Sequence, residues 1–425
     1  MTRQRESSMY LGEIRLNWRT LLAASAGIAM GTSLSHYTMS LFAPSLLAEF
    51  GWSKAEFALI GSIPLLTVLL VPFAGRFTDR FGPRVAASVG FTVFPLGFVA
   101  YTLMSGGLVE FFAIYLVQHI FGILTTSLVF ARVVVERFDA ARGIALSVLM
   151  TGPPLSGAIA APLLGGIIAD SGWRTGFLTL AALSALGGLT AILLMSRTRK
   201  QTPKTREETK LTRGELLALV RNPTLLLILA GMFLINLPQG FASSQLKLAL
   251  LDLGAGDSAA TWMLSLYAGG VIVGRFSSGL ALDRIPPHLV AIATLGLPAI
   301  GFAVLASSAG VIGMLAGAVL LIGLAQGAEG DICAYLVSRR FDMKNYSLLL
   351  SCVTSMITAG SAVGSLILSF TLADTDSYRP FLVVAAIATL AGAILFGLTG
   401  SARLRNRHTE VEEKVVAQAI VGEIG

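Results

Sequence analysis

Charged residues are scarce in this sequence. Only 13% of its 425 residues are Asp, Glu, Lys or Arg, about half the share usual in soluble domains, while 54% are apolar. A soluble protein of this composition would expose large apolar patches and aggregate. The scarcity of charge therefore excludes an ordinary soluble domain and favours a protein that lies in a lipid bilayer, where the 45 glycines also suit close contacts between helices.

Cysteine and histidine are also scarce, which limits the chemistry that the chain could carry out. The two cysteines, Cys333 and Cys352, lie within apolar segments, and a disulfide framework is not expected. The four histidines form no cluster at metal-binding spacing, and the motifs HExxH and GxSxG and a phosphate-binding loop do not occur. The sequence predicts a protein that is not an enzyme and needs no metal or other cofactor.

Long apolar segments fill most of the chain. A transmembrane helix needs roughly 20 predominantly apolar residues, and such segments recur with short polar intervals. We predict an all-α membrane protein with twelve transmembrane helices, at residues 19–47, 55–77, 84–106, 108–131, 142–169, 174–196, 223–250, 259–281, 288–309, 311–337, 346–371 and 379–400.

The positions of lysine and arginine predict the orientation. If the N-terminus is cytoplasmic, the outer side carries only Lys54, Arg174, Lys247 and Arg379, and Arg275 lies inside a span. The rest of the 31 lysines and arginines then fall on the cytoplasmic side, as the positive-inside rule requires. Both termini are therefore predicted to be cytoplasmic. The same placement explains the net charge of +7 without nucleic-acid binding, and the first residues, MTRQRESS, do not resemble a removable signal peptide.

Three short matches indicate that the two sets of six spans repeat each other. GRFTDR at 75–80 matches GLALDR at 279–284, an Arg-Phe-Asp triplet occurs at 137–139 and 340–342, and Trp173-Arg174 matches Tyr378-Arg379. Parallel six-helix repeats are typical of transporters that rock around a central site. The predicted parts are a cytoplasmic N-terminal segment, a first six-helix half, a cytoplasmic linker, a second six-helix half and a cytoplasmic tail, at residues 1–18, 19–196, 197–222, 223–400 and 401–425.

The loop after the second span has the pattern G-x-x-x-D-R-x-G-x-R, formed by Gly75, Asp79, Arg80, Gly82 and Arg84. Together with the twelve predicted spans and the internal repeat, this pattern resembles the major facilitator superfamily. The resemblance covers nearly the whole chain. It implies two pseudo-symmetric six-helix halves and transport by alternating access.

In that superfamily the loop connects helices across the inner gate. The resemblance implies that Asp79 caps or pairs there, and that Arg80 and Arg84 bind helix ends or acidic side chains. Gly75 is expected to let helices approach closely. The repeat assigns the same gating role in the second half to Gly279, Asp283 and Arg284.

Within the superfamily the chain resembles most the branch of monocarboxylate and oxalate–formate porters. This resemblance is carried by RGIALSVLMTGPPLSG in the fifth span, GRFSSGLALDR in the eighth and GLAQGAEGDICAYLVSRRF in the tenth. The chain departs from the branch at Val271, where many members have an acid, and in the eleventh span, which lacks the lysine of oxalate exchangers. The resemblance implies a small organic anion, a monocarboxylate or an aromatic acid, as substrate.

Arg275 is the arginine of the eighth span, nine residues before Arg284. That spacing places it ~13 Å from the cytoplasmic end, close to the middle of the bilayer. An arginine at this depth costs at least ~2.5–3.5 kcal/mol on insertion scales, so it needs a partner or a hydrated cavity. The resemblance implies that Arg275 binds the substrate carboxylate, which a guanidinium can hold through two parallel hydrogen bonds.

Glu329 and Asp331 lie in the tenth span, ~12–15 Å deep and level with Arg275. Because they are two residues apart, they are ~200° apart around the helix and cannot share one face. We expect one of them to pair with Arg275 and the other to face the cavity or a gate. Both are candidate proton-coupling residues, since a buried carboxylate binds a proton according to the charges around it. A static salt bridge between the eighth and tenth spans is the alternative.

Polar residues recur at helical spacing in the first, fourth, seventh and tenth spans, the ones that line the cavity in the superfamily. Interhelical hydrogen bonds, worth ~0.6 kcal/mol each, would explain the same pattern without a substrate. Besides Arg275, the candidate substrate-binding residues are His36, Tyr37, Gln118, His119, Asn236 and Gln239.

Pro153 and Pro154, with Gly152 and Gly157, predict a break in the fifth span, as a hinge or a site of close packing. The run GPPLSG also partly matches the glycine–proline motif of drug–proton antiporters. Two functions therefore remain: proton-coupled symport or exchange of a small organic anion, and proton-driven efflux of drugs or siderophore-like compounds. The expected partners are the anion, protons and the bilayer of an inner (plasma) membrane, and the chain is expected to act as a monomer.

Overall fold

The computed structural model describes residues 2–195, 221–307, 311–341 and 346–400. These residues form helices joined by short turns, and within these ranges there is no β-strand. The predicted tail lies outside the described residues, and so does the predicted linker apart from Arg221 and Asn222.

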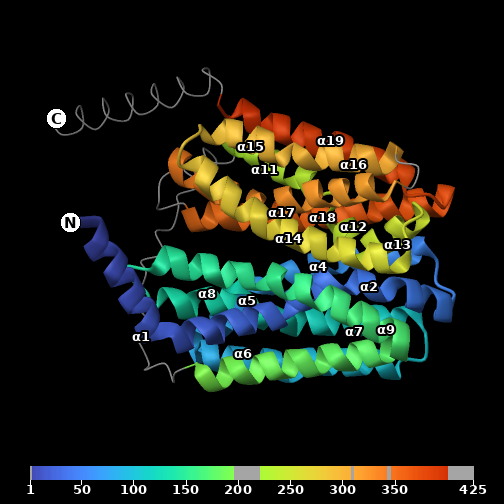
Figure 1. The fold of residues 1–425 in the computed structure, drawn as a ribbon, viewed down its shortest axis with the longest axis horizontal. Helices are drawn as coiled ribbons and strands as arrows, with labels where there is room; N and C mark the ends of the chain where they lie inside the picture. Colours follow the sequence, from blue (N-terminus) through green and yellow to red (C-terminus); the bar gives the residue numbers. More distant parts are fainter. Residues whose placement is uncertain (1, 196–220, 308–310, 342–345, 401–425) are drawn as a thin grey trace.

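The helices form two layers, which Figure 1 shows one above the other. The lower layer contains α1 (Thr2–Met30), α2 (Thr32–Phe50), α3 (Lys54–Ala58), η1 (Leu59–Ser62), α4 (Ile63–Val68), α5 (Val71–Phe81), α6 (Pro83–Leu103), α7 (Leu108–Gly122), η2 (Ile123–Thr125), α8 (Ser127–Val135) and α9 (Arg142–Leu194). The upper layer contains α11 (Pro223–Ile235), α12 (Gln239–Ser244), α13 (Leu246–Asp252), α14 (Asp257–Leu282), α15 (Pro287–Leu295), α16 (Leu297–Ser307), α17 (Ile312–Arg340), α18 (Tyr346–Thr375) and α19 (Arg379–Leu398).

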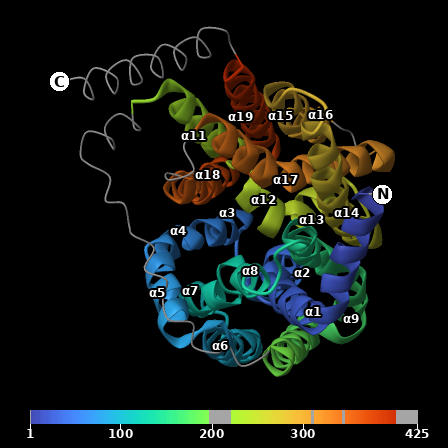
Figure 2. The ribbon, with the colours of Figure 1, turned by 90° about the vertical axis from the view of Figure 1, so that its left-hand side faces the viewer.

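The two ends of the molecule are named here by their loops. The terminal end carries the start of α1 and the loops 136–141 and 283–286, and it faces the viewer in Figure 2. The distal end carries the loops 51–53, 104–107 and 253–256.

Eight helices in the described ranges are long and apolar enough to cross a membrane, and the bent pair Lys54–Val68 and Val71–Phe81 makes a ninth span if it is counted as one. One of the eight, α9, has 53 residues and is interrupted at Gly172, where φ is +81°. The predicted spans 142–169 and 174–196 are therefore joined in α9. The predicted first span is divided between α1 and α2, and the predicted eighth span is α14.

Five of the predicted spans are interrupted: the second by a 54° bend between Val68 and Val71, the ninth between α15 and α16, and the first, fourth and seventh near their middle. The first breaks at Gly31, where a Cβ atom would lie 2.4 Å from Thr125 Oγ1, and the backbone N–H of Thr32 donates to that hydroxyl over 3.0 Å. Thr125 belongs to η2, which is the break in the fourth span. The seventh breaks between α11 and α12, just before Pro238, which lacks a backbone N–H. Hydrophobicity alone did not reveal these breaks because the residues around them are mostly apolar.

The predicted break at Pro153 and Pro154 was wrong. Helix α9 keeps helical backbone angles through both prolines, and the non-helical residue inside it is Gly172. The segment instead packs closely: Ser156 Oγ donates to the Ala29 carbonyl over 2.9 Å, and a Cβ on Gly157 would lie 2.6 Å from Tyr37.

The buried apolar side chains form three clusters. One contains residues of both halves, and each of the other two contains residues of one half. The shared cluster lies toward the distal end and includes Phe42 and Phe98 from the first half and Phe241 and Phe381 from the second. At the terminal end each half has its own cluster, formed by residues between 21 and 195 or between 225 and 396. The two halves therefore share a hydrophobic core at the distal end, and the structure is closed there.

Glycine allows α14 and α17 to pack backbone against backbone. A Cβ on Gly274 would lie 1.9 Å from the Leu324 carbonyl oxygen, and one on Gly327 would lie 2.0 Å from the Val271 carbonyl oxygen. Small residues four positions apart on each helix are the usual means of such close approach in lipid. This contact fixes the predicted eighth and tenth spans side by side and sets the distance between their charged residues.

Candidate functional site

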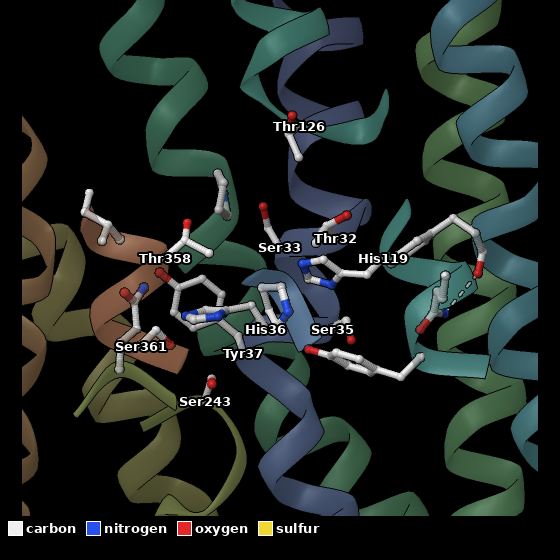
Figure 3. Close-up of a pocket in the computed structure, with 17 residues that line it drawn as sticks. Thr32, Ser33, Ser35, His36, Tyr37, His119, Thr126, Ser243, Thr358 and Ser361 are labelled. Carbon is white, nitrogen blue, oxygen red and sulfur yellow. Dashed lines mark hydrogen bonds between the residues drawn. The ribbon is translucent and has the colours of Figure 1, made fainter. Parts of the chain in front are cut away.

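A cavity of about 360 Å³ lies between the two halves. Figure 3 shows polar side chains reaching into it from both halves. The described residues that line it include no carboxylate, and His36 and His119 are those that can gain a positive charge. The lining consists of Thr32, Ser33, Ser35, His36, Tyr37, Pro64, Phe94, Tyr115, Gln118, His119, Thr126, Pro153, Gln239, Ser243, Ile357, Thr358 and Ser361.

The break at Gly31 places the first two turns of α2 on this cavity. His36 and Tyr37 project from those turns, with their rings 5.1 Å apart in an edge-to-face arrangement. From α7, His119 stacks on Tyr115 at 5.4 Å. The two imidazoles lie close together in Figure 3, each beside a tyrosine ring. This side of the cavity therefore offers both aromatic surface and hydrogen-bonding nitrogen atoms.

Gln118 lines the same wall, but its amide already has partners in the first half. Gln118 Nε2 donates to the Phe94 carbonyl over 3.0 Å, and the Tyr101 hydroxyl donates to Gln118 Oε1 over 3.4 Å. The side chain is buried. The sequence predicts Gln118 as a substrate ligand, and the contacts seen here fix the position of helix α7 against α6.

The second half contributes Gln239 and Ser243 from α12, and Thr358 and Ser361 from α18. Gln239 Oε1 is buried and accepts no hydrogen bond from the described residues. Asn236, at the end of α11, is buried and does not belong to the lining; its Nδ2 donates to the Met232 carbonyl over 2.9 Å. In the structure, Gln239 therefore lines the cavity and Asn236 does not.

Arg275 lies at the contact between the halves rather than on the cavity. One terminal nitrogen donates to the Met150 carbonyl of α9 over 2.5 Å, and Nε lies 3.3 Å from Asp331 Oδ2. Its charge acts on Tyr37, which does line the cavity and whose ring is 6.2 Å from that of Tyr267 on α14. The guanidinium therefore does not line the cavity, but its charge acts on a ring that does.

The two acids of α17 have different surroundings. Asp331 is half exposed beside Arg275, whereas Glu329 is 7% exposed and its Oε1 accepts a hydrogen bond of 3.0 Å from Gln326 Nε2. Glu329 also lines a second cavity of about 20 Å³, which lies next to the first. Gln239 lines both cavities.

Two overlapping parts of the chain, residues 21–249 and 231–422, match the profile of the Major Facilitator Superfamily. The chain belongs to this superfamily. Family and fold identify a transporter and not an enzyme.

Several known proteins are similar to this transporter. The Agnestins efflux protein AgnL12 of Paecilomyces divaricatus is 22% identical over 347 residues, which are 79% of this chain and 75% of that protein. The uncharacterized transporter YybO of Bacillus subtilis (strain 168) is 24% identical over 165 residues, 38% of this chain and 37% of that protein.

Solved structures show the same fold. The nucleoside transporter NupG superposes with a TM-score of 0.74 at 12% identity, covering 91% of this chain and all of that one. A D-xylose–proton symporter superposes with a TM-score of 0.70 at 15% identity, covering 91% and 97%. At these identities the likeness establishes the fold and leaves the substrate open.

The G-x-x-x-D-R-x-G-x-R motif of this major facilitator protein, predicted to act in gating, forms contacts within the first half. Asp79 pairs with Arg132 at the end of α8, and Arg132 Nε also lies 2.8 Å from Glu136 Oε1. The guanidinium of Arg80 lies 5.4 Å from the ring centre of Phe81. The motif therefore connects α5 to α8.

The glycines of the motif have different surroundings. Gly82 joins α5 to α6 with φ +86° and ψ 158°, a conformation that is essentially restricted to glycine. Gly75 was expected to allow close helix approach, but a Cβ there would meet nothing within 4 Å, and the same holds for Gly279. In this conformation there is therefore open space for a Cβ atom at both positions.

The other gate candidates form few contacts in this conformation. Arg84 lies in the first turn of α6 and is half-buried. Asp283 and Arg284 are exposed, and within the described part of the chain their side chains form no hydrogen bond or ion pair.

Sequence reasoning missed two matching contacts at the distal end, one within each half, although the internal repeat could have indicated them. Trp173 Nε1 donates to Glu49 Oε2 over 2.5 Å, and the matching Tyr378 donates its hydroxyl to Gln245 Oε1 over 2.6 Å. The Trp173 indole, and then Arg174, hold the pKa of the Glu49 carboxyl below its usual range. In each half, the ring just before the last predicted span is thus hydrogen-bonded to a residue near the end of the first span of that half.

Proposed function

We propose that this transporter moves a small organic anion, a monocarboxylate or an aromatic acid, by alternating access, in symport with protons or in exchange for a second anion. The observation that carries the proposal is the composition of the cavity wall. Its described residues offer imidazole, hydroxyl and amide groups and no carboxylate. A lipophilic cation would find no counter-charge there, whereas a carboxylate would find several hydrogen-bond donors.

The size and the rings of the cavity support a small, flat substrate. Its volume of about 360 Å³ lies at the lower end of the range for small-molecule sites. Tyr37, Tyr115 and Phe94 provide aromatic faces, and the two histidines lie beside the tyrosines. An aromatic acid could stack on a ring while its carboxylate accepts hydrogen bonds from His36 or His119.

Arg275 supplies the positive charge in this proposal, although it does not line the cavity in the present conformation. Its charge acts on Tyr37, and its guanidinium is held by the Met150 carbonyl and by Asp331. A carboxylate bound at His36 and Tyr37 would be attracted by this charge across a poorly solvated wall, where electrostatic interactions are strong. Asp331 balances the guanidinium when no anion is bound.

Glu329 is the proposed proton-coupling residue. It is more deeply buried than Asp331, and the Arg275 charge acts on it. Binding of an anion near Arg275 reduces the net positive charge around Glu329, which favours the protonated carboxyl. Anion and proton would then cross together with less net charge.

We also propose the topology of the superfamily fold for this chain, with twelve spans, both termini cytoplasmic and a monomer in an inner membrane. The distribution of lysine and arginine supports this orientation. The terminal end then faces the cytoplasm, and the present structure is closed toward the outside. The helices give the predicted twelve spans if α9 is counted as two spans and each interrupted helix as one.

The test is thermal stabilisation of the detergent-purified protein by pyruvate, benzoate and tetraphenylphosphonium, at acidic and at alkaline pH. We expect one of the two acids to stabilise the wild type, more strongly at acidic pH, and to lose its effect in Arg275→Ala and His36→Ala. Arg174→Ala is the matched control, because Arg174 lies at the distal end and pairs with Glu49. Stabilisation of Arg275→Ala and the wild type to the same extent by an acid would contradict the proposal.

Proton-driven efflux of a lipophilic compound is the second candidate, because the similar protein from Paecilomyces divaricatus is an efflux protein. In that case tetraphenylphosphonium would stabilise the wild type and Arg275→Ala equally, and neither acid would have an effect. Arg275 would then serve as a structural partner of α9 and α17.

A further inference from the structure

The second cavity, of about 20 Å³, lies between α11, α12, α16 and α17 and is mostly apolar. Three polar side chains reach it, those of Gln239, Gln326 and Glu329. Of its lining residues, Gln239 is the one that also lines the central cavity. The remainder of its wall consists of Ile235, Pro238, Ala242, Pro298, Phe302, Ile322 and Ala325.

The size and the polar groups of this second cavity match one water molecule. A buried water needs about 10–15 Å³ of accessible volume and two to four polar partners. Gln239 Oε1 is buried and accepts no hydrogen bond within the described residues, so it can accept one from a water. Glu329 receives the Gln326 amide on Oε1 and also interacts with the Asn236 side chain; because a carboxylate has about four acceptor sites, the same water can still donate to it.

We propose that the second cavity binds one water molecule through which protons pass between the central cavity and Glu329, and that Gln239 positions this water. The inference rests on the proposed proton-coupling function of Glu329. In the transfer, the water gives one proton to the Glu329 carboxylate and takes one from a hydronium ion in the central cavity, so that the water is regenerated, the hydronium ion becomes water and Glu329 becomes neutral. The reverse transfer releases the proton.

Among the polar groups around Glu329, Gln239 borders the central cavity, so a proton from that cavity can approach Glu329 past Gln239. Arg275 and Tyr267 approach from α14, Tyr37 from α2, and Asn236 from α11. Arg275 repels a proton, and Tyr267 and Asn236 are buried. Asp331 and Cys333 lie on the same helix, with Asp331 paired to Arg275.

The test compares two substitutions at Ala325, a small residue that lines the second cavity. Ala325→Val fills the space that the water needs, whereas Ala325→Ser adds a hydroxyl that can hydrogen-bond. The readout is infrared spectroscopy after the buffer is changed rapidly from alkaline to acidic. The spectrum of Glu329→Gln is subtracted from each spectrum, so that the remaining carboxyl band is that of Glu329. No transport substrate is required.

We expect Glu329 to be protonated at least ~10-fold more slowly in Ala325→Val than in the wild type, and at the wild-type rate in Ala325→Ser, in keeping with the ~10²–10⁴-fold effects of positioned proton-transfer groups. Gln239→Leu should show the same slowing and Gln239→Asn a partial recovery, which keeps the test valid if Ala325→Val does not fold. Equal rates in the wild type, Ala325→Val and Gln239→Leu would overturn the water route while leaving Glu329 as the coupling residue. Absence of any Glu329 band in the wild type would instead contradict the coupling function itself.

Discussion

Lys54 Nζ lies 2.5 Å from Asp252 Oδ2, so that the start of α3 in the first half is joined to the end of α13 in the second. Asp376 lies 3.9 Å from the same ammonium group. The backbone carbonyl of Lys54 accepts a hydrogen bond from Gln245, which in turn accepts one from the Tyr378 hydroxyl. Burial raises the pKa of Tyr378 well above its usual value, so this hydroxyl remains a donor. The contacts of Lys54 with Asp252, Asp376 and Gln245 join the two halves and must separate before the distal end can open.

Lys54→Ala should therefore shift the transporter toward conformations with an open distal end. Both partners are partly exposed, with side-chain exposures of 25% and 36%, so we expect a change of about 0.2–1 kcal/mol, or roughly 1.4- to 5-fold in the equilibrium. The measurement is the distance distribution between spin labels at Gly107→Cys and Ser258→Cys, with Cys333 and Cys352 replaced.

Asp252→Ala should give the same shift, and the double variant should add little to either single one, because both changes remove the same contact. Independent, additive shifts would show that the ion pair does not connect the two halves.

Gly327→Ala should destabilise the folded protein. The added Cβ would lie 2.0 Å from the Val271 carbonyl oxygen, so α14 and α17 would have to separate, at a cost of about 1–3 kcal/mol. The control is Gly330→Ala on the same helix, where a Cβ meets nothing within 4 Å. The measurement is the melting temperature in detergent; equal values for the two variants would contradict the close packing described here.

The two glycines of the gating motif should respond differently to alanine. Gly82→Ala places a side chain at φ +86° and should cost about 1–3 kcal/mol of stability. Gly75→Ala should leave the melting temperature unchanged, since its surroundings are open. If the terminal faces meet during the cycle, Gly75→Ala should still slow transport. A Gly82→Ala protein as stable as the wild type would rule out this account of the motif.

Glu13→Gln should remove a pH-dependent part of the stability. The Asp139 N–H, and then the Ala141 N–H, hold the pKa of the Glu13 carboxyl below its ordinary value of 4.5. Since the folded pKa is lowered, this contribution is present above pH 4.5 and is lost as the pH falls through the folded pKa. Melting temperatures should therefore be lower for Glu13→Gln than for the wild type at neutral pH and should converge in strong acid. A constant difference across this range would refute the assignment.

The polar residues of the candidate site were predictable as a group and not as individual contacts. His36, Tyr37, His119 and Gln239 were selected by helical spacing, and the structure places all four on one cavity. Asn236 was selected by the same spacing and lies behind the wall, because the chain turns between α11 and α12. Helical spacing predicts which residues share one face only as long as the helix continues without a break.

The pairing of one acid with Arg275 was likewise predictable, and which acid it is was not. The sequence predicts Arg275, Glu329 and Asp331 at one level because each helical residue advances by about 1.5 Å. Asp331 lies beside Arg275 and Glu329 lies on the second cavity because of how α17 is rotated against α14. That rotation is fixed by the backbone contacts of Gly274 with Leu324 and of Gly327 with Val271.

The sequence by itself determined that this protein is a helical membrane transporter built from two repeated halves, because apolar length, charge asymmetry and internal repetition are properties of the chain order. Only the tertiary structure decided that the halves are closed at the distal end, that Arg275 acts on Tyr37 without lining the cavity, and that Gln239 borders two cavities. Each residue advances ~100° around its helix, so a small rotation or a single break changes which side chains meet. Those rotations are set by packing between helices that are far apart in the sequence.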